Sequence, residues 1–138
     1  MARILIVDDE LSIREYLEML LSRSGHVVEL AESFGVANGL LTSRSYDLVI
    51  SDFRIGNESG IDVLKVASSH APPLEVIIIT AYGTPASAVQ AMRQGAYDYI
   101  SKPFDNDEMV LLVDRALEKS RLTEENRQLR ATLSPLAQ

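Results

Sequence analysis

The stretch Ile4-Leu5-Ile6-Val7-Asp8-Asp9-Glu10 decides the fold, because a short, wholly apolar segment ends abruptly in three acidic residues. An apolar run of this length is typical of a parallel β-strand that is buried on both faces. Open α/β sheets bind their ligands at the carboxyl ends of such strands. Crowded carboxylates repel one another and lose hydration, and a hard cation such as Mg²⁺ relieves both costs. The stretch therefore predicts a cation site at the carboxyl edge of a parallel sheet.

Three further apolar segments of the chain also end in polar side chains. The segments and the residues that follow them are 47–51 before Asp52, 75–79 before Thr80, and 97–101 before Lys102. If these strands are parallel within one sheet, their polar side chains meet Asp8 and Asp9 at one edge. Three carboxylates, a hydroxyl and an ammonium group in one cleft suit a divalent cation together with a phosphoryl group.

The composition restricts the class of protein. The chain has 138 residues, the size of one ordinary domain, and 46% of them are hydrophobic, which is enough for a core. It has no cysteine, which excludes disulfides and thiolate metal sites. Because residues 1–3 lead straight into the first strand and the apolar runs are too short to span a bilayer, we expect a soluble cytoplasmic domain without membrane contact. A net charge of −7 argues against nucleic-acid binding by this segment.

Apolar segments alternate with amphipathic ones along the chain, which is typical of βαβ units. Residues 26–31 form a further predicted strand, and helices are predicted over 12–24, 33–43, 61–69, 84–94 and from 106 onward. Ser12 is the predicted N-cap of the first helix, and Glu15 would complete a capping box. Right-handed crossovers then give an α/β doubly wound sandwich of five strands and five helices.

The last predicted helix is longer than one that merely docks on a sheet, since it extends to about residue 133, before Ser134-Pro135. Within it, a spacing of 4, 3 and 4 residues separates Leu122, Asn126, Leu129 and Leu133. This is a heptad seam with asparagine at an a-type position, which favours a dimeric coiled coil. A solvated linker helix is the alternative. We therefore expect a domain over residues 1–120 and a helical extension over 121–138 that leads toward an output domain.

Taken together, the chain resembles the receiver domain of two-component response regulators. The resemblance covers about residues 3–120 and rests on Val7-Asp8-Asp9-Glu10, Ser51-Asp52, Thr80-Ala81 and Lys102-Pro103-Phe104, in this order. It implies a flavodoxin-like (βα)5 fold with the parallel strand order 2-1-3-4-5. Residues 80–84, residues 95–99 and the helical tail are similar to those of sigma-54-dependent transcription activators of the nitrogen-regulation type. In those proteins the receiver precedes an AAA+ ATPase domain and a DNA-binding helix-turn-helix.

The resemblance implies that Asp52 is the phosphoacceptor and that a sensor histidine kinase supplies the phosphoryl group. Lys102 would pair with a phosphoryl oxygen, and Thr80 would donate a hydrogen bond to the phosphoryl group. Pro103 matches a cis-proline that aims the lysine inward. The chain would carry out only its own phosphorylation and dephosphorylation, so it is not an enzyme in the usual sense.

The resemblance also implies a magnesium site, with Mn²⁺ as an alternative ion. Asp9 would bind the ion directly, Asp8 would act mainly through metal-bound water, and Asp52 and the backbone carbonyl of Arg54 would supply further oxygens. Octahedral oxygen coordination that retains several waters is what Mg²⁺ prefers. Stabilisation of the first helix dipole is the alternative role for Asp8 and Asp9. Glu10 is expected to be a solvated loop residue.

Tyr99 matches the switch aromatic of the family. Movement of Thr80 toward the phosphoryl group would open space for the ring, and the face formed by the fourth helix, fifth strand and fifth helix would respond. The expected result is a change in the geometry of a homodimer that controls an output domain absent from this segment.

Other classes of protein fit the sequence less well. A flavodoxin-like domain that binds a nucleotide or flavin would carry a G-x-G-x-x-G turn after its first strand, whereas here acidic residues follow. A degenerate receiver used only for dimerisation would not keep the complete set Asp8, Asp9, Asp52, Thr80 and Lys102. A hydrolase acting on an external phosphoester is a further alternative, which phosphorylation and metal-binding measurements would separate from a receiver.

Overall fold

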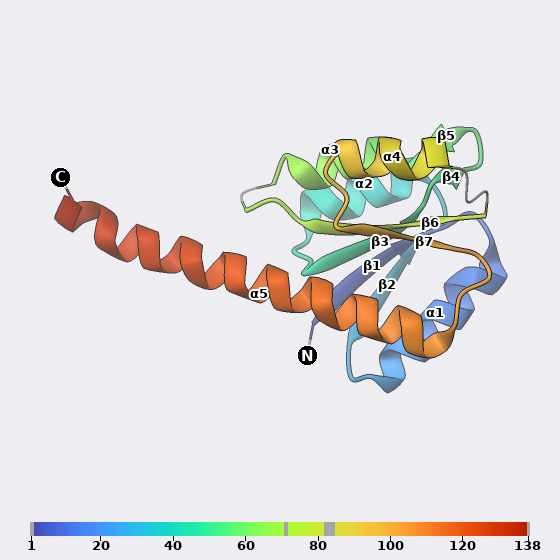
Figure 1. The fold of residues 1–138 in the computed structure, drawn as a ribbon, viewed down its shortest axis with the longest axis horizontal. Helices are drawn as coiled ribbons and strands as arrows, with labels where there is room; N and C mark the ends of the chain where they lie inside the picture. Colours follow the sequence, from blue (N-terminus) through green and yellow to red (C-terminus); the bar gives the residue numbers. More distant parts are fainter. Residues whose placement is uncertain (1, 71, 82–84, 138) are drawn as a thin grey trace.

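A computed structural model of the chain describes residues 2–70, 72–81 and 85–137 (Figure 1). It has three layers, with a parallel sheet between α1 and α5 on one face and α2, α3 and α4 on the other. The elements are β1 (Arg3–Val7), α1 (Leu11–Arg23), β2 (Val27–Ala31), α2 (Phe34–Ser43), β3 (Leu48–Asp52), β4 (Arg54–Ile55), β5 (Glu58–Ser59), α3 (Gly60–Ser68), β6 (Glu75–Thr80), α4 (Pro85–Arg93), β7 (Asp98–Ser101) and α5 (Asn106–Ala137).

The strand order of the main sheet is β2-β1-β3-β6-β7, and every neighbouring pair is parallel. When the small β4–β5 hairpin is set aside, this is the predicted order 2-1-3-4-5, so the fold class is confirmed. The register pairs Val7 with Ser51, and Thr80 with Ser101. The residues that follow these strand ends are therefore brought to one edge of the sheet.

The interior strand β1 is buried on both faces, as its continuous apolar run predicts. Residues 4–7 are each 0% exposed. Successive side chains of a strand point to opposite faces, so Leu5 and Val7 belong to the core under α2 and α3, while Ile4 and Ile6 belong to the core under α1 and α5. The acidic residues that follow are thus carried by a strand that is buried on both faces.

The start of α1 differs from the prediction. The helix begins at Leu11 with Glu10 as its N-cap, so the prediction of Ser12 as the N-cap was wrong. The carbonyl of Glu10 already accepts the first helical hydrogen bond, from the Arg14 amide at 3.2 Å. An Asp8 oxygen accepts the Glu10 amide at 2.9 Å and fixes this early start. The hydrogen bond from the Glu10 amide to Asp8 therefore outweighs the capping signal at Ser12.

The helix α5 leaves the domain and projects far from the sheet (Figure 1). Beyond Ala116 its described side chains are exposed or half-buried. Pairs that join Arg121 to Glu118 and Glu125, and Arg127 to Glu124, support this exposed part at helical spacing. The helix ends at Ala137, past the predicted stop at residue 133. A proline removes one N–H donor from a helix, and water can satisfy the carbonyl that this leaves.

Among the described residues, no helix combines the length and the apolar character that crossing a membrane requires.

Candidate functional site

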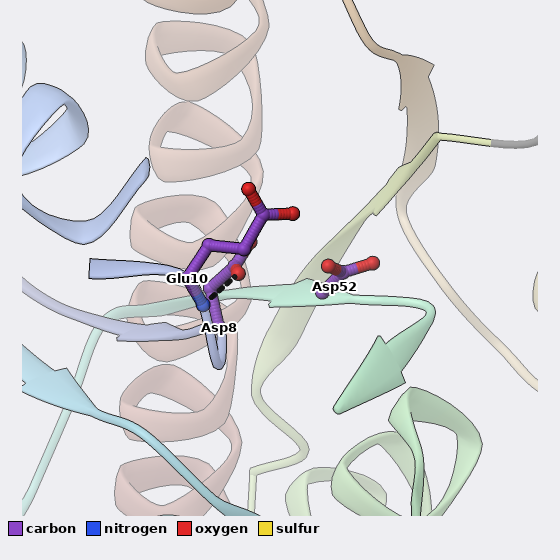
Figure 2. A group of neighbouring side chains, drawn as sticks. All are labelled: Asp8, Glu10 and Asp52. Atoms are coloured by element: carbon purple, nitrogen blue, oxygen red, sulfur yellow. Dashed lines mark hydrogen bonds between the residues drawn. The ribbon is translucent and has the colours of Figure 1, made fainter. Parts of the chain in front are cut away.

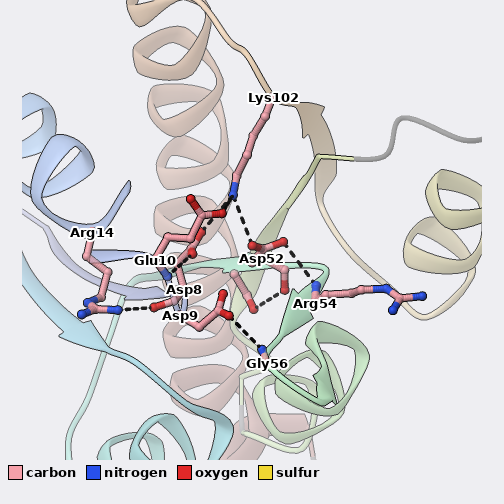
Figure 3. A network of polar contacts seen from close by, with 9 residues as sticks. Asp8, Asp9, Glu10, Arg14, Asp52, Arg54, Gly56 and Lys102 are labelled. Atoms are coloured by element: carbon pink, nitrogen blue, oxygen red, sulfur yellow. Dashed lines mark hydrogen bonds and ion pairs between the residues drawn. The ribbon is translucent and has the colours of Figure 1, made fainter. Parts of the chain in front are cut away.

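The Lys102 ammonium lies among three carboxylates at the carboxyl edge of the sheet (Figure 3). Its Nζ is 3.2 Å from Asp52 Oδ2, 3.4 Å from Asp8 Oδ2 and 3.6 Å from Glu10 Oε1. Asp52 is the last residue of β3, Asp8 follows β1, and Lys102 follows β7. The parallel sheet therefore brings together residues that lie as far as 94 positions apart in the chain.

The four charged groups differ strongly in their burial. The exposed fractions of the side chains are 1% for Asp8, 10% for Asp52, 14% for Lys102 and 58% for Glu10. Asp8 and Asp52 thus hold their charges largely out of water, which is costly for charges that are not fully compensated. Glu10 keeps much of its hydration.

Burial raises the pKa of Asp8 to about 6, and the negative charge of Asp52 adds to this effect. The hydrogen bond from the Glu10 amide and the charge of Lys102 act in the opposite direction on the Asp8 pKa but do not cancel the increase. Burial by itself would lower the pKa of Lys102, but the charges of Asp52 and Asp8 outweigh it and raise that pKa. Lys102 is therefore charged at neutral pH, while burial and the charge of Asp52 disfavour the ionised form of Asp8.

Backbone contacts shape the two loops that border the site. Arg14 donates from Nη1 to the Asp8 carbonyl at 2.7 Å, which holds the loop between β1 and α1. The Arg54 amide donates to Asp52 Oδ1 at 3.2 Å. The Gly56 amide donates to Asp9 Oδ2 at 3.2 Å, which ties the acidic loop to the β4–β5 hairpin (Figure 3). This hairpin occupies most of the segment 53–59, for which the sequence analysis predicts neither a strand nor a helix.

The acidic residues form a plausible set of oxygen donors for a cation. One oxygen from each of Asp8, Glu10 and Asp52 lies within 4.8 Å of the others (Figure 2). Hard cations such as Mg²⁺ bind carboxylate oxygens. Their positive charge would offset the burial and the repulsion from Asp52 that raise the pKa of Asp8. The donor chemistry of the site therefore fits the predicted cation.

The set of residues brought together differs from the predicted set at one position. Asp8, Asp52 and Lys102 converge as predicted. The side chain of Asp9 is bonded to the Gly56 amide, and Glu10, which is exposed as expected of a solvated loop residue, nevertheless joins the carboxylate cluster. Glu10 could have been predicted as part of the cluster from its position directly after Asp8 and Asp9, because the loop before α1 is too short to place its side chain far from them. The roles of Asp9 and of the Arg54 carbonyl as metal ligands stay predictions.

Thr80 and Tyr99 lie on the two strands beside the site. Thr80 is buried at the end of β6, and its carbonyl accepts the Lys102 amide at 2.8 Å. Tyr99 lies on the edge strand β7 and is 40% exposed. The Lys102–Pro103 peptide bond is cis, as the family resemblance implies. Thr84, the predicted start of the fourth helix, lies outside the described residues.

The predicted dimer seam lies on the exposed part of α5. Leu122 is 50% exposed and Leu129 is 62% exposed, and Asn126 is exposed between them. The side chain of Leu133 lies outside the described residues. The described part of the seam is therefore accessible to a partner, although its pairing is a prediction.

Comparison with known proteins identifies the family. The sequence model of the "Response regulator receiver domain" family matches residues 4–114. The regulatory protein AtoC of Escherichia coli (strain K12) is 40% identical over 132 residues, which cover 96% of this chain and 29% of AtoC. The DNA-binding transcriptional regulator NtrC of Klebsiella pneumoniae is 44% identical over 112 residues, which cover 81% of this chain and 24% of NtrC.

A solved structure agrees with these relatives. The crystal structure of NtrX from Brucella abortus in complex with ADP superposes with a TM-score of 0.85 at 38% sequence identity, over 94% of this chain and 30% of that chain. This chain thus spans less than a third of the length of these relatives. They confirm the predicted resemblance to the receivers of nitrogen-regulation-type activators. Because the family match covers most of the chain and coincides with the sheet and its acidic edge, this protein belongs to the response regulator receiver domain family.

Proposed function

We propose that the domain is a phosphorylation-controlled switch in which Asp52 accepts a phosphoryl group from a sensor histidine kinase. The observation that carries the proposal is the position of Asp52, whose carboxylate ends a buried strand 3.2 Å from the Lys102 ammonium. An oxygen of Asp52 would form a bond to phosphorus while the bond from phosphorus to the kinase histidine breaks. The electron pair of that bond stays on the imidazole nitrogen, and the product is an acyl phosphate on Asp52.

The surrounding groups have distinct roles in this proposal. Asp8, Asp9, Asp52 and the Arg54 carbonyl would hold Mg²⁺ or Mn²⁺, which when bound supplies positive charge opposite the phosphoryl oxygens. Lys102 exchanges its carboxylate partners for a phosphoryl oxygen, and its charge is already in place before transfer. The Thr80 hydroxyl donates a hydrogen bond to the phosphoryl group. The domain acts only on its own phosphoryl group.

An exposed apolar face supports the proposal that the switch controls dimerisation. The edge strand β7 lies beside α4, and α5 covers the other face of the sheet. Large apolar side chains on these elements are exposed by 40–51%, namely Val89, Met92, Tyr99 and Leu111. Apolar groups that gather on one surface mark interaction sites. Tyr99 lies on β7, two strands from β3 and Asp52, so it is the proposed link between phosphorylation and a homodimer.

The proposed output lies beyond the domain. Residues 1–120 form the receiver and 121–138 a helical extension, in which Leu122, Asn126, Leu129 and Leu133 would pair with a second copy. NtrC is a DNA-binding transcriptional regulator and AtoC a regulatory protein, and this chain matches less than a third of either. In the full-length protein we therefore expect an AAA+ domain and a DNA-binding domain, controlled in the cytoplasm as in sigma-54-dependent activators.

Incubation with Mg²⁺ and acetyl phosphate tests the phosphoacceptor directly. The intact mass should increase by one phosphoryl group, and Asp52→Asn should abolish the increase because an amide is a poor nucleophile. Asp114→Asn, on the exposed surface of α5, is the matched control and should be phosphorylated like the original chain. An equal mass gain in Asp52→Asn would place the phosphoryl group elsewhere and refute the proposal.

Tyr99→Ala should separate phosphorylation from its consequence. We expect the same mass gain with acetyl phosphate, because the described ion pairs of the site join Lys102 to Asp8, Glu10 and Asp52 and do not involve Tyr99. The dissociation constant of the phosphorylated dimer should rise by about tenfold, the usual cost of truncating an aromatic side chain at the centre of an interface. Sedimentation equilibrium of both forms measures this change. Met19→Ala, 46% exposed on α1, is the control. Loss of phosphorylation in Tyr99→Ala would contradict the assigned role.

A further inference from the structure

Glu10 occupies the N-cap position of α1 without acting as a helix cap. Its backbone is extended, with φ −90° and ψ 119°, which is the usual conformation of a capping residue. Within the described structure, however, its side chain accepts no hydrogen bond from the first amides of the helix. The position of its carboxylate therefore has a cause other than helix capping.

The phosphoacceptor site provides that cause. The Glu10 amide is bonded to Asp8 Oδ1 at 2.9 Å, which folds the loop so that the Glu10 side chain lies over Asp8 (Figure 2). One carboxylate oxygen of Glu10 then lies within 4.8 Å of oxygens of both Asp8 and Asp52, and Oε1 is 3.6 Å from Lys102 Nζ. Glu10 thus lies near two carboxylates of the same charge, although its side chain could point into the solvent instead.

The three carboxylates differ in how far the solvent reaches them. Asp8 and Asp52 are 1% and 10% exposed and cannot leave the site, whereas Glu10 is 58% exposed and can swing into water at little cost. A flexible, hydrated carboxylate at the mouth of a buried acidic pair acts mainly through its charge. That charge attracts cations and holds Lys102 toward the outer side of the site.

We propose that Glu10 is a positioning residue that raises the affinity of this site for a divalent cation through its charge, and shares Lys102 with Asp8 and Asp52 until the cation is bound. The inference rests on the proposed function for the use of that cation. A half-exposed unit charge beside a divalent ion, in a largely aqueous dielectric, changes the affinity by about five- to tenfold. The effect should be screened by salt, because Glu10 is reached by solvent.

Cation titrations of matched variants test the proposal without any phosphorylation. Free Mn²⁺ is measured by electron paramagnetic resonance, and Mg²⁺ binding by calorimetry, at low and high ionic strength. Glu10→Gln should weaken the binding of both ions by about fivefold at low salt, and this difference should shrink at high salt. Glu10→Asp keeps the charge and should stay within about twofold of the original chain, since it loses only reach. Glu18→Gln removes the same charge from an exposed position on α1 and should have no effect.

The outcomes separate this inference from the proposed function. Equal cation affinity in Glu10→Gln and Glu18→Gln would overturn the role of Glu10, even if Asp52 is phosphorylated normally. A loss that is as large in Glu10→Asp as in Glu10→Gln, and independent of salt, would also overturn it, because the carboxylate would then be a direct ligand. If the original chain binds neither ion, the cation assignment in the proposed function fails as well.

Discussion

Replacing Gly60 with alanine is expected to destabilise the domain by about 3 kcal/mol and to impair phosphorylation of Asp52. Gly60 is the first residue of α3, and a Cβ atom there would lie 2.2 Å from the carbonyl oxygen of Asp52. The obstruction is backbone, which cannot rotate away as a side chain can. The Gly60 amide also donates to the Phe53 carbonyl at 2.8 Å, so the two chain segments cannot separate without losing that bond.

Thermal unfolding measures the effect of Gly60→Ala, and the midpoint should fall by about 10 °C for a domain of this size. Gly39→Ala provides the matched control. An added Cβ at Gly39 meets nothing within 4 Å, and the residue is exposed within α2. This control should stabilise the protein by up to about 1 kcal/mol, because alanine favours a helix more than glycine does. If both variants unfold at the same temperature, the close approach at Gly60 is not a constraint on the site.

The second large effect is expected for Asp8→Asn, which should stabilise the metal-free protein while it slows phosphorylation. The Asp8 carboxylate is buried beside Asp52, and its pKa is raised to about 6. An asparagine oxygen can still accept the Glu10 amide, so the loop keeps its shape. Removal of the buried charge should yield about 1–2 kcal/mol at pH 7.5, after allowance for partial screening. The buried charge of Asp8 would thus lower the stability of the metal-free fold because the function of the site requires that charge.

The dependence on pH distinguishes this explanation from a simple packing effect. Because folding raises the Asp8 pKa from 3.8 to about 6, the folded state binds the proton more tightly than the unfolded state between these values. The penalty due to Asp8 is therefore complete above pH 6 and is relieved as the pH falls toward 4. The stability advantage of Asp8→Asn over the original chain should be largest at pH 7.5 and small at pH 4.5.

Urea unfolding in the presence of a chelator measures this difference at both pH values. Asp114→Asn, exposed on α5, should leave the free energy of unfolding unchanged at either pH. Addition of Mg²⁺ at pH 7.5 should stabilise the original chain more than Asp8→Asn, since ligand binding to the folded state shifts the equilibrium. A stability difference that does not change with pH would show that the Asp8 charge is not its cause.

Local sequence patterns predicted most of the sheet, because each buried strand has its own signal. The apolar run of residues 4–7 is uninterrupted since both faces of β1 are covered, and its 0% exposure confirms this interpretation. The glycines at positions 35 and 39 did not prevent α2 from forming, because packing against β2 and α3 stabilises a helix that intrinsic propensity leaves weak.

The errors occurred in short loops, where individual hydrogen bonds rather than a periodic pattern decide the structure. The capping signal at Ser12 is intact in the sequence, yet the N-cap lies two residues earlier, at Glu10, because Asp8 binds the Glu10 amide. The hairpin of β4 and β5 has only two residues in each strand, which is too short for a periodic pattern. Neither feature produces a periodic pattern in the sequence.

The sequence by itself determined the parallel sheet and the edge at which its polar side chains gather, because strand burial and the direction of parallel strands leave little freedom there, while the family resemblance supplied the strand order. The tertiary structure decided which contact each acidic residue makes. Asp9 binds the Gly56 amide, while Glu10 joins Asp8 and Asp52 around Lys102. Adjacent carboxylates have the same chemistry in the sequence, and only the positions of a distant amide and a distant ammonium group distinguish them.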